Sequence, residues 1–497
     1  MRAGNLADTF IGYFSPKSLV ERKRARIQAQ LLERFETRQY EAASHSNRLR
    51  NWYTPRTSAN VETKLSTLTL RDRARDLVRN NPHSARAVNV ITSYSVGAGI
   101  VPQIRAKDPT KQKKIEALWK NWALNPKCID SEQRHDLYSL QSLAMRAVVE
   151  SGECLVKIHK GAPGLIPYSI QLLEPDFIDS FREYRTEGGY VIQGIEHDKQ
   201  GRRTAYWLFK EHPGGFVNLS SYSAISEQIP ADEILHIYRC ERPSQVRGVS
   251  WFAPVLIALK DLSDFEDAQL LKQKISACFA VFVRDLEQGI DPLSQNNPDD
   301  KNAVGRLEPG SIQYLAPGQD VTFASPSPLD GYGEYCARVL RAISVGLGLN
   351  YENLTGDLSQ VNFSSGRMGF LDFQRNLELW RWNIMILQFC EPIWKIFLQS
   401  LEILGIDTSD VTVTWTPPRT PMIDPSKELE SIRTGIRGGL YTLSESLREL
   451  HGTDPQAHLE ELASDFKLLD KLGLKLDTDP RNDIKPNQPN PIPTPQE

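Results

Sequence analysis

Asp72 and Asp76 lie one helical turn apart and are the first pair of side chains that could do chemistry. Paired carboxylates on one helix face can hold the divalent cation of a nuclease. Arg71, Arg73 and Arg75 alternate with them, however, and this pattern is more typical of an ion-paired helix face. We therefore interpret the pair as structural.

Other catalytic signatures are missing from the sequence, which has no Walker phosphate-binding loop, no GxSxG and no HExxH. Gly97-Ala98-Gly99 lacks the third glycine of a dinucleotide-binding loop and ends a predicted helix. The nine histidines show no metal-ligand spacing, and no two of the six cysteines lie within twenty residues of each other. We expect reduced, mostly buried thiols, and no metal or cofactor. Scattered carboxylates could still form an active site.

Cap signals predict where the first helices begin. Asn81-Pro82 and Asp108-Pro109 each place a capping side chain before a proline, a pattern typical of a helix N-terminus. A third amphipathic helix is predicted over 137–150. Before these helices we expect a polar helix at 16–43, a polar connector at 44–66 and a short helix from Leu68 to Arg79.

After Gly152 the pattern changes to short apolar runs that favour strands. Asp198-Lys199-Gln200-Gly201 is typical of a hairpin turn. The predicted strands are Cys154–His159, Tyr168–Leu173, Tyr190–His197, Thr204–Lys210 and Glu233–Arg239. Because no helices alternate with these strands, we predict an α+β unit and not a regular βαβ series.

The next predicted elements surround a proline-rich segment. A helix from residue 252 ends in the strand-like run Cys278–Val283, and another helix covers 331–348. Between them, residues 286–328 carry six prolines, which favours a small, loop-rich β module. The C-terminal elements are a strand at Val411–Thr416, three short helices opened by Asp424-Pro425, Thr442 with Glu445, and Asp454-Pro455, and a disordered tail at 478–497.

The run from Arg367 to Leu404 predicts one helix of roughly 55–60 Å. Its single proline, Pro392, should kink it. Its apolar content all round predicts burial on most sides. The most apolar stretch, Asn383–Gly405, is interrupted by Glu391, Pro392, Lys395 and Glu402, so we predict no membrane-spanning helix.

The formal net charge of −3 hides an uneven distribution. Residues 1–86 carry 17 Lys and Arg against 8 Asp and Glu, a difference of +9, which leaves 42 against 54, or −12, for the remaining residues. A basic front suggests an acidic partner such as nucleic acid, and a solvated helix face explains it equally well.

Four stretches in the same order along the chain resemble the lambda-type family of bacteriophage portal proteins. They are RDRARDLVRNNPHSARAVNVITSYSVGAG at 71–99, RPSQVRGVSWFAPVLIALKDLSDFED at 242–267 with the following FAVFV, TGDLSQVNFSSGR at 355–367, and MIDPSKE with GIRGGLYTLSE at 422–445. Phe363 stands where the family pattern leads us to expect Tyr, and the stretch His451–Asp454 matches more loosely.

The resemblance implies a portal fold with a mixed wing, a helical stem, a small clip, a long kinked helix and a helical crown, assembled as a cyclic ring. The parts carry over as a basic arm at 1–66, the wing at 67–250, stem helices at 251–285 and 329–351, the clip at 286–328, the tunnel loop at 352–366, the kinked helix at 367–404, a wing strand at 405–424, the crown at 425–476 and the tail at 477–497.

The resemblance also implies a function without catalysis. A homo-oligomeric ring, usually of about twelve subunits, would sit at one vertex of the phage head and conduct double-stranded DNA. Its partners would be the terminase large subunit, a head-completion or adaptor protein, and the major capsid and scaffold proteins. The protein would act in the virion, after assembly in the host cytoplasm. The alternatives are a metal-dependent nuclease with a basic arm and another ring-forming head or tail adaptor.

In this interpretation, neutral polar groups of the tunnel loop could touch phosphates or groove edges without sequence specificity, or the loop is an ordinary flexible connector. Arg338 and Arg341, on one helix face, could form a positive ring in the channel or pair with a neighbouring subunit. Arg367 could contact DNA or cap the loop onto the next subunit. The loop candidates are Gln360, Asn362, Ser364 and Ser365. The candidates in the clip for terminase docking are Gln295, Asn296, Asn297, Asp299, Asp300 and Lys301.

Overall fold

The computed structural model describes residues 56–215, 225–277, 281–285, 319–323, 331–419, 424–451 and 455–474, together with residues 17, 24, 25, 51 and 54. The chain divides into two units, Met1–Ser58 and Ala59–Glu497, and almost all of the described residues belong to the second. Most of the predicted polar helix at 16–43, most of the β module at 286–328 and the whole tail at 478–497 lie outside the described residues.

Three predicted helices begin or end at the residues that the cap signals indicated. Helix α4 (Pro82–Ser95) follows Asn81, whose Oδ1 accepts the Ser84 N–H at 3.0 Å, and α5 (Pro109–Ala123) follows Asp108 in the same manner. After the short α6 (Pro126–Ile129), α7 (Leu137–Ser151) ends at Gly152, whose φ of 92° suits glycine. These predictions are confirmed.

Helix α3 (Ala59–Asn80) begins earlier than the predicted start at Leu68. Its buried face includes Thr67 and Arg71 beside apolar residues, so polar side chains interrupt the apolar spacing that marks a helix. The predicted connector at 44–66 is therefore wrong over its last residues, which are helical.

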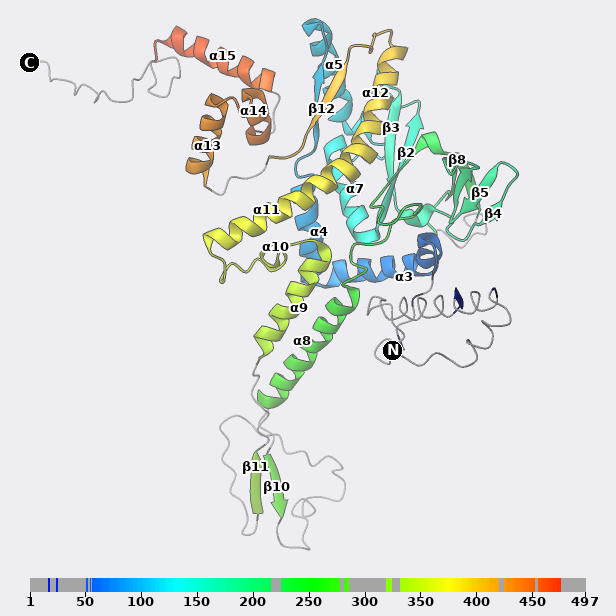
Figure 1. Ribbon diagram of the computed structural model, residues 1–497, viewed down its shortest axis with the longest axis vertical. Helices are drawn as coiled ribbons and strands as arrows, with labels where there is room; N and C mark the ends of the chain where they lie inside the picture. Colours follow the sequence, from blue (N-terminus) through cyan, green and yellow to red (C-terminus); the bar gives the residue numbers. More distant parts are fainter. Residues whose placement is uncertain are drawn as a thin grey trace, which may run out of the picture. The chain divides into compact units, whose positions relative to one another are not determined.

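Two antiparallel sheets follow the helices, as the α+β prediction required (Figure 1). In the first, β2 (Glu153–Lys160) lies between β3 (Tyr168–Leu173) and β9 (Ile234–Tyr238). The second sheet has five strands in sequence order. They are β4 (Tyr184–Arg185), β5 (Gly189–Ile192), β6 (Ile195–Asp198), β7 (Arg203–Phe209) and β8 (Ser226–Pro230).

The single strand predicted over Tyr190–His197 is wrong, because the chain reverses within it. Gln193 and Gly194 have φ angles of 49° and 78° and join β5 to β6 as a hairpin. A Cβ on Gly194 would lie 2.6 Å from the Asp179 carbonyl oxygen, so the turn also needs glycine for space. The hairpin turn predicted at 198–201 is confirmed between β6 and β7.

A strand from the C-terminal part returns to the N-terminal helices. β12 (Thr412–Thr416) pairs antiparallel with β1 (Val101–Arg105), and Val101 lies opposite Thr416. The predicted strand at 411–416 is confirmed, and β1 was missed.

Two helices pack side by side, and two short paired strands lie between them in sequence (Figure 1). The Phe265 ring of α8 (Leu256–Ala277) stacks on Tyr332 of α9 (Tyr332–Leu347), with centroids 5.8 Å apart. Between these helices, β10 (Val281–Asp285) pairs antiparallel with β11 (Gln319–Phe323). At Gly346 a Cβ would lie 2.4 Å from Val255 Cγ1, so a side chain there would collide with a buried neighbour.

The predicted loop at 352–366 is shorter than expected. α10 (Tyr351–Thr355) covers its start, and α11 (Phe363–Trp380) begins inside it. The loop is therefore residues 356–362, and the long helix begins at Phe363 instead of Arg367. The Ser and Gly residues after Asn362 look like a loop in sequence, but Asn362 caps a helix that contains them.

The long helix continues through a π-helical segment, Arg381–Cys390, into α12 (Glu391–Ile403). The Glu391 N–H donates to the Ile386 carbonyl, five residues back. Pro392 has no N–H, and its ring would press on the Gln388 carbonyl in a regular α-helix. The wider turn relieves this contact. The predicted change of direction is present between α11 and α12, and its structural form is the π-helix (Figure 1).

This helix is 41 residues long and apolar enough to cross a membrane by length and composition. The prediction that no helix spans a membrane was based on the shorter stretch Asn383–Gly405. Within the most apolar 18-residue window of this helix, 56% of the window is buried inside the protein. Such burial is also typical of a core helix in a soluble protein. Phe373, Leu377 and Phe389 lie in the main hydrophobic cluster with residues of α4, α5 and α7.

Polar contacts fix the same helix to three other elements. The Arg381 guanidinium donates to the carbonyl oxygens of Tyr94 and Ser95 at the end of α4, at 2.6 and 3.1 Å. The Gln388 side chain accepts the Tyr238 N–H of β9 at 3.0 Å. The Glu391 carboxylate accepts from Trp415 Nε1 of β12 at 2.7 Å.

Three C-terminal helices are present as predicted: α13 (Pro425–Arg437), α14 (Leu443–His451) and α15 (Pro455–Leu472). Asp424 and Thr442 cap the first two by accepting the N–H groups of Lys427 and Glu445. The α15 helix contacts β1 through Arg105 and Gln456, whose side chains hydrogen-bond at 2.9 Å.

A fully buried carboxylate, Glu153 of β2, joins α3, β9 and the following loop. Its Oε1 accepts from Arg71 at 2.9 Å and from Arg247 at 2.6 Å. Its Oε2 accepts from His236 Nε2 at 2.9 Å and from the Gly248 N–H at 2.8 Å. Burial opposes the charge, but Arg247 and His236 hold the pKa of Glu153 well below its usual range.

We expect the stability of this region to fall as the pH drops from about 6.5 to about 4. Burial lowers the pKa of His236 to about 4, whereas the unfolded chain binds that proton near pH 6.5. Acid therefore favours the unfolded state, and the free energy of unfolding should be lower by about 3 kcal/mol at pH 4 than at neutral pH. Urea unfolding across this range measures the effect. His236→Gln should flatten the pH dependence, and the exposed control His135→Gln should not. Parallel curves for wild type and His236→Gln would contradict this assignment.

A methyl group at Gly346 should loosen the packing of α9 on Val255. We expect Gly346→Ala to destabilise by about 1–3 kcal/mol because the new Cβ overlaps Val255 Cγ1. Gly333→Ala in the same helix is the matched control, because a Cβ there meets nothing within 4 Å and should stabilise the helix slightly. Thermal unfolding of the two variants measures the difference in their stability, and equal melting temperatures would contradict the prediction.

Candidate functional site

The loop residues predicted to contact DNA lie together at the exposed start of α11. Asn362 Oδ1 accepts the Ser365 N–H at 2.8 Å, and Ser365 Oγ accepts the Asn362 N–H at 3.2 Å. This reciprocal cap orders the turn. Gln360 precedes it, and Ser364 and Arg367 follow in the first turns of the helix. The residues are grouped as predicted, but Ser364, Ser365 and Arg367 belong to a helix and not to a loop.

The phosphate contacts suggested for this exposed turn stay a prediction. Its hydroxyl and amide groups can donate hydrogen bonds, and a helix N-terminus carries partial positive charge. Within the described part of the chain, Arg367 forms no hydrogen bond or ion pair, so its charge is available. These groups are compatible with the predicted contacts to phosphates.

Arg338 and Arg341 are both exposed on α9, on the face that their spacing indicated. The Arg341 guanidinium lies over the Tyr351 ring, with Cζ 5.0 Å from the ring centroid. Arg338 has no partner among the described residues. The positive ring suggested for these two arginines stays a prediction.

The six clip residues predicted to dock the terminase lie outside the described residues: Gln295, Asn296, Asn297, Asp299, Asp300 and Lys301. The flanking strands β10 and β11 are described, and their antiparallel pairing agrees with a small β module between α8 and α9.

The interpretation of Asp72 and Asp76 as partners of the neighbouring arginines is wrong for two of those arginines. Arg71 points into the protein and binds Glu153, and Arg75 pairs with Asp176 at 2.7 Å. Asp76 accepts instead from Asn80 Nδ2 at 2.7 Å. The sequence hides this because the true partners are some eighty to one hundred residues away.

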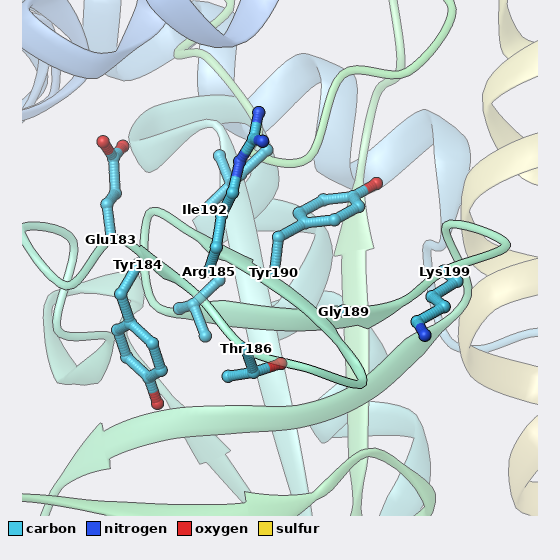
Figure 2. Close-up of a pocket in the computed structure, with 9 residues that line it drawn as sticks. Glu183, Tyr184, Arg185, Thr186, Gly189, Tyr190, Ile192 and Lys199 are labelled. Carbon is cyan, nitrogen blue, oxygen red and sulfur yellow. The ribbon is translucent and has the colours of Figure 1, made fainter.

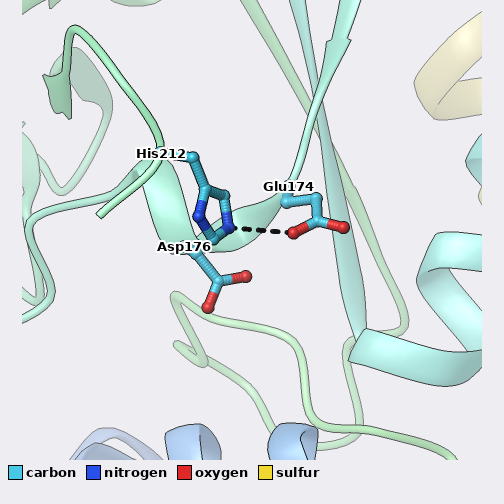
Figure 3. A group of neighbouring side chains, drawn as sticks. All are labelled: Glu174, Asp176 and His212. Atoms are coloured by element: carbon cyan, nitrogen blue, oxygen red, sulfur yellow. Dashed lines mark hydrogen bonds and ion pairs between the residues drawn. The ribbon is translucent and has the colours of Figure 1, made fainter. Parts of the chain in front are cut away.

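One group of metal-ligand type, which histidine spacing did not reveal, joins Glu174, Asp176 and His212 (Figure 3). Their ligand atoms lie within 4.8 Å of one another, and His212 Nε2 is 3.0 Å from Glu174 Oε2. Arg75 Nη2 already contacts Asp176 at 2.7 Å and Glu174 at 3.2 Å. The carboxylates are thus neutralised by arginine, which a cation would have to displace.

A hollow of about 730 Å³ lies over the β4–β5 hairpin, with Lys199 contributed by the turn between β6 and β7 (Figure 2). Its lining includes no histidine or cysteine, and its carboxylate, Glu183, is ion-paired with Lys64 at 2.5 Å. These residues offer no activated nucleophile and no pair of catalytic carboxylates.

The cysteines that the structure describes are all free. Cys154, Cys336 and Cys390 are buried, as expected for most of them, whereas Cys240 is exposed. Burial raises the pKa of the Cys154 thiol to about 12, so this group stays protonated and unreactive at neutral pH.

Known proteins resemble this chain over most of its length. The family described as phage portal protein, lambda family, matches residues 45–381. A probable portal protein of Halomonas phage phiHAP-1 is 25% identical, covering 82% of this chain and 81% of that protein. The portal protein of Escherichia phage N15 is 24% identical and portal protein B of Escherichia phage lambda is 22% identical. Each of these two alignments covers 64% of this chain and 66% of the relative.

Solved structures are similar at low identity. A chain in the neck of a native gene transfer agent particle, computed with C12 symmetry, has a TM-score of 0.44 and 16% identity, covering 76% of this chain and 93% of that one. An HK97 family phage portal protein from Corynebacterium diphtheriae has a TM-score of 0.32 and 10% identity, covering 70% and 94%.

The family match extends over residues 45–381 of 497, which is more than half of the chain. The resemblance seen in the four sequence stretches is thereby confirmed. The chain belongs to the lambda family of phage portal proteins.

Proposed function

We propose that about twelve copies of this chain form a ring at one vertex of a phage head and conduct double-stranded DNA during packaging and ejection. Family membership supports this role. The ring would assemble in the host cytoplasm with the major capsid and scaffold proteins. The terminase large subunit would dock on the segment between β10 and β11, and a head-completion or adaptor protein would follow. The chain itself would carry out no catalysis.

The observation that carries the ring is a row of exposed apolar side chains on the long helix. Met368, Leu371, Leu379 and Trp382 follow one another at spacings of three, eight and three residues, and between 50% and 71% of each is exposed. Because these spacings keep residues on one face of a helix, the row lies opposite the buried face that includes Phe373. An exposed apolar row of this length suits contact with another protein surface.

A ring of identical subunits supplies such a surface. In a cyclic assembly one face of each subunit meets a different face of its neighbour, so every subunit buries two unlike sides. A long helix that is apolar on two faces fits this requirement: one face packs in its own subunit and the other is free to pack on the next.

The charge distribution also suits a conduit. Strong binding to many phosphates would hold DNA in place, because affinity rises with the number of neutralised phosphates. Residues 87–497 carry 42 Lys and Arg against 54 Asp and Glu, so most of the chain repels DNA weakly. Isolated positive groups such as Arg367 would then make short-lived contacts.

The alternative of a metal-dependent nuclease has little support in the described residues. Asp72 and Asp76 lie on an exposed helix face, and the two carboxylates grouped with His212, Glu174 and Asp176, are paired with Arg75. The alternative of a smaller head or tail adaptor does not account for a family match over 45–381.

Leu379→Glu should reduce the fraction of chain in rings at least about tenfold, because a charge replaces a buried apolar group at every subunit contact. Native mass spectrometry and electron microscopy of the full chain measure this fraction. Leu165→Glu is the matched control, since Leu165 is exposed to a similar extent, 66% against 57%, in a loop. A wild-type chain that never forms rings with a central hole, even with scaffold protein, would overturn the proposed function. Normal rings from Leu379→Glu would overturn the assignment of the row.

A further inference from the structure

Two arginines of α9 have the same charge and exposure but different surroundings. Arg338 and Arg341 are three residues apart, and both are exposed. The Arg341 guanidinium lies 5.0 Å from the centroid of the Tyr351 ring, a geometry typical of a cation–π contact. Arg338 has no such neighbour among the described residues. A role that is specific to Arg341 is therefore testable against Arg338.

The Tyr351 ring connects Arg341 to the first residues of the 356–362 loop. Tyr351 begins α10, and its hydroxyl helps to lower the pKa of the carboxyl group of Asp357, the second residue of the loop. Hydrogen bonds from Ser359 lower the pKa of Asp357 most, and Tyr351 and Arg341 lower it further. Arg341 thus contacts Tyr351, and both side chains interact electrostatically with Asp357, so the interactions extend from α9 to the loop.

A second arginine holds α10 from the other side. Arg86 Nε of α4 donates to the Asn353 carbonyl at 2.9 Å. Gly356, with a φ of 77°, turns the chain beneath it, and a Cβ on Gly356 would lie 3.4 Å from Arg86 Nη2. Because Leu354 is also fully buried, α10 has little freedom to rotate.

The far end of the loop is fixed by α11. The Asn362–Ser365 cap orders its last residue. Asn376 of the same helix donates to the Gly348 carbonyl at 3.3 Å, which ties α11 to the end of α9. Between these fixed ends, Leu358, Ser359 and Gln360 are exposed. The direction of these exposed residues is therefore set at the two ends of the loop and not by burial of the loop itself.

We propose that Arg341 is a positioning residue, which holds the 356–362 loop through Tyr351 and Asp357 and does not itself line the channel. This assignment rests on the proposed function only in taking the loop as the part that meets DNA. The distinction matters because the two arginines, indistinguishable in sequence, then act differently: Arg338 remains available to phosphate, and Arg341 is committed to the loop.

Hydrogen exchange of the full chain, followed by mass spectrometry, tests the positioning. The Ser359 N–H donates to Asp357 Oδ1 at 3.0 Å and the Val361 N–H to the Leu358 carbonyl at 3.1 Å, so ordered loop amides are protected. Arg341→Ala should speed exchange in 356–362 about three- to tenfold and leave exchange in the α8–α9 pair unchanged. Arg338→Ala, which removes the same charge from the same helix, should change neither.

Two further variants keep the test decisive if Arg341→Ala folds poorly. Tyr351→Leu removes the intermediate ring and should speed loop exchange to a similar extent. Combining it with Arg341→Ala should add little, because both act through one set of contacts. Unchanged loop exchange in Arg341→Ala and Tyr351→Leu, or an equal increase in Arg338→Ala, would overturn the proposal.

DNA retention in assembled particles separates this inference from the function it rests on. Faster loop exchange together with altered retention in Arg341→Ala particles supports both. Faster loop exchange with normal rings and normal retention supports the positioning role and counts against the loop as the part that meets DNA. Loss of rings in the wild-type chain concerns the proposed function alone, since loop exchange is measured on any folded form.

Discussion

Burial of one face of the long helix Phe363–Ile403 is the constraint on which the described fold depends. Residues far apart in sequence meet on it: the end of α4 through Arg381, the edge strand β9 through Gln388, and β12 through Glu391. Apolar contacts add to these, such as Tyr94 against Phe373, with ring centroids 5.5 Å apart. The helix therefore acts as the common support of the helical layer and the first sheet.

The same helix has to remain continuous past a proline. A regular α-helix would place the Pro392 ring against the Gln388 carbonyl, which costs about 3 kcal/mol or more. The π-helical turns before Pro392 avoid that clash without ending the helix. They also present Arg381 and Gln388 to backbone groups of α4 and β9. The irregular segment is thus both the solution to a steric problem and the place where the helix is attached.

Local signals in the sequence predicted most of the element boundaries, because a cap or a turn depends on a few adjacent residues. Asn81-Pro82 and Asp108-Pro109 are of this kind. The predicted boundaries are wrong where the local structure depends on a residue far away in sequence. Thr67 and Arg71 are buried because α3 packs on the rest of the fold, where Glu153 pairs with Arg71. The Gln193-Gly194 turn depends on close packing against Asp179. The predicted loop at 352–366 was longer than the observed one, because Ser and Gly residues can also occur in a helix that follows a strong cap.

The candidate site shows the same division between local and distant information. The sequence groups Gln360 and Asn362 with the α9 arginines, and the family resemblance led to the prediction that this group contacts DNA. The sequence alone does not distinguish Arg338 from Arg341. The two differ in their contact with Tyr351, which comes close to Arg341 only because the chain turns at Gly348 after α9. Two equal charges on one helix face are therefore unequal in the folded chain. In the proposed conduit, an arginine held by an aromatic ring would add order to the loop without adding a strong phosphate site, so DNA could still slide.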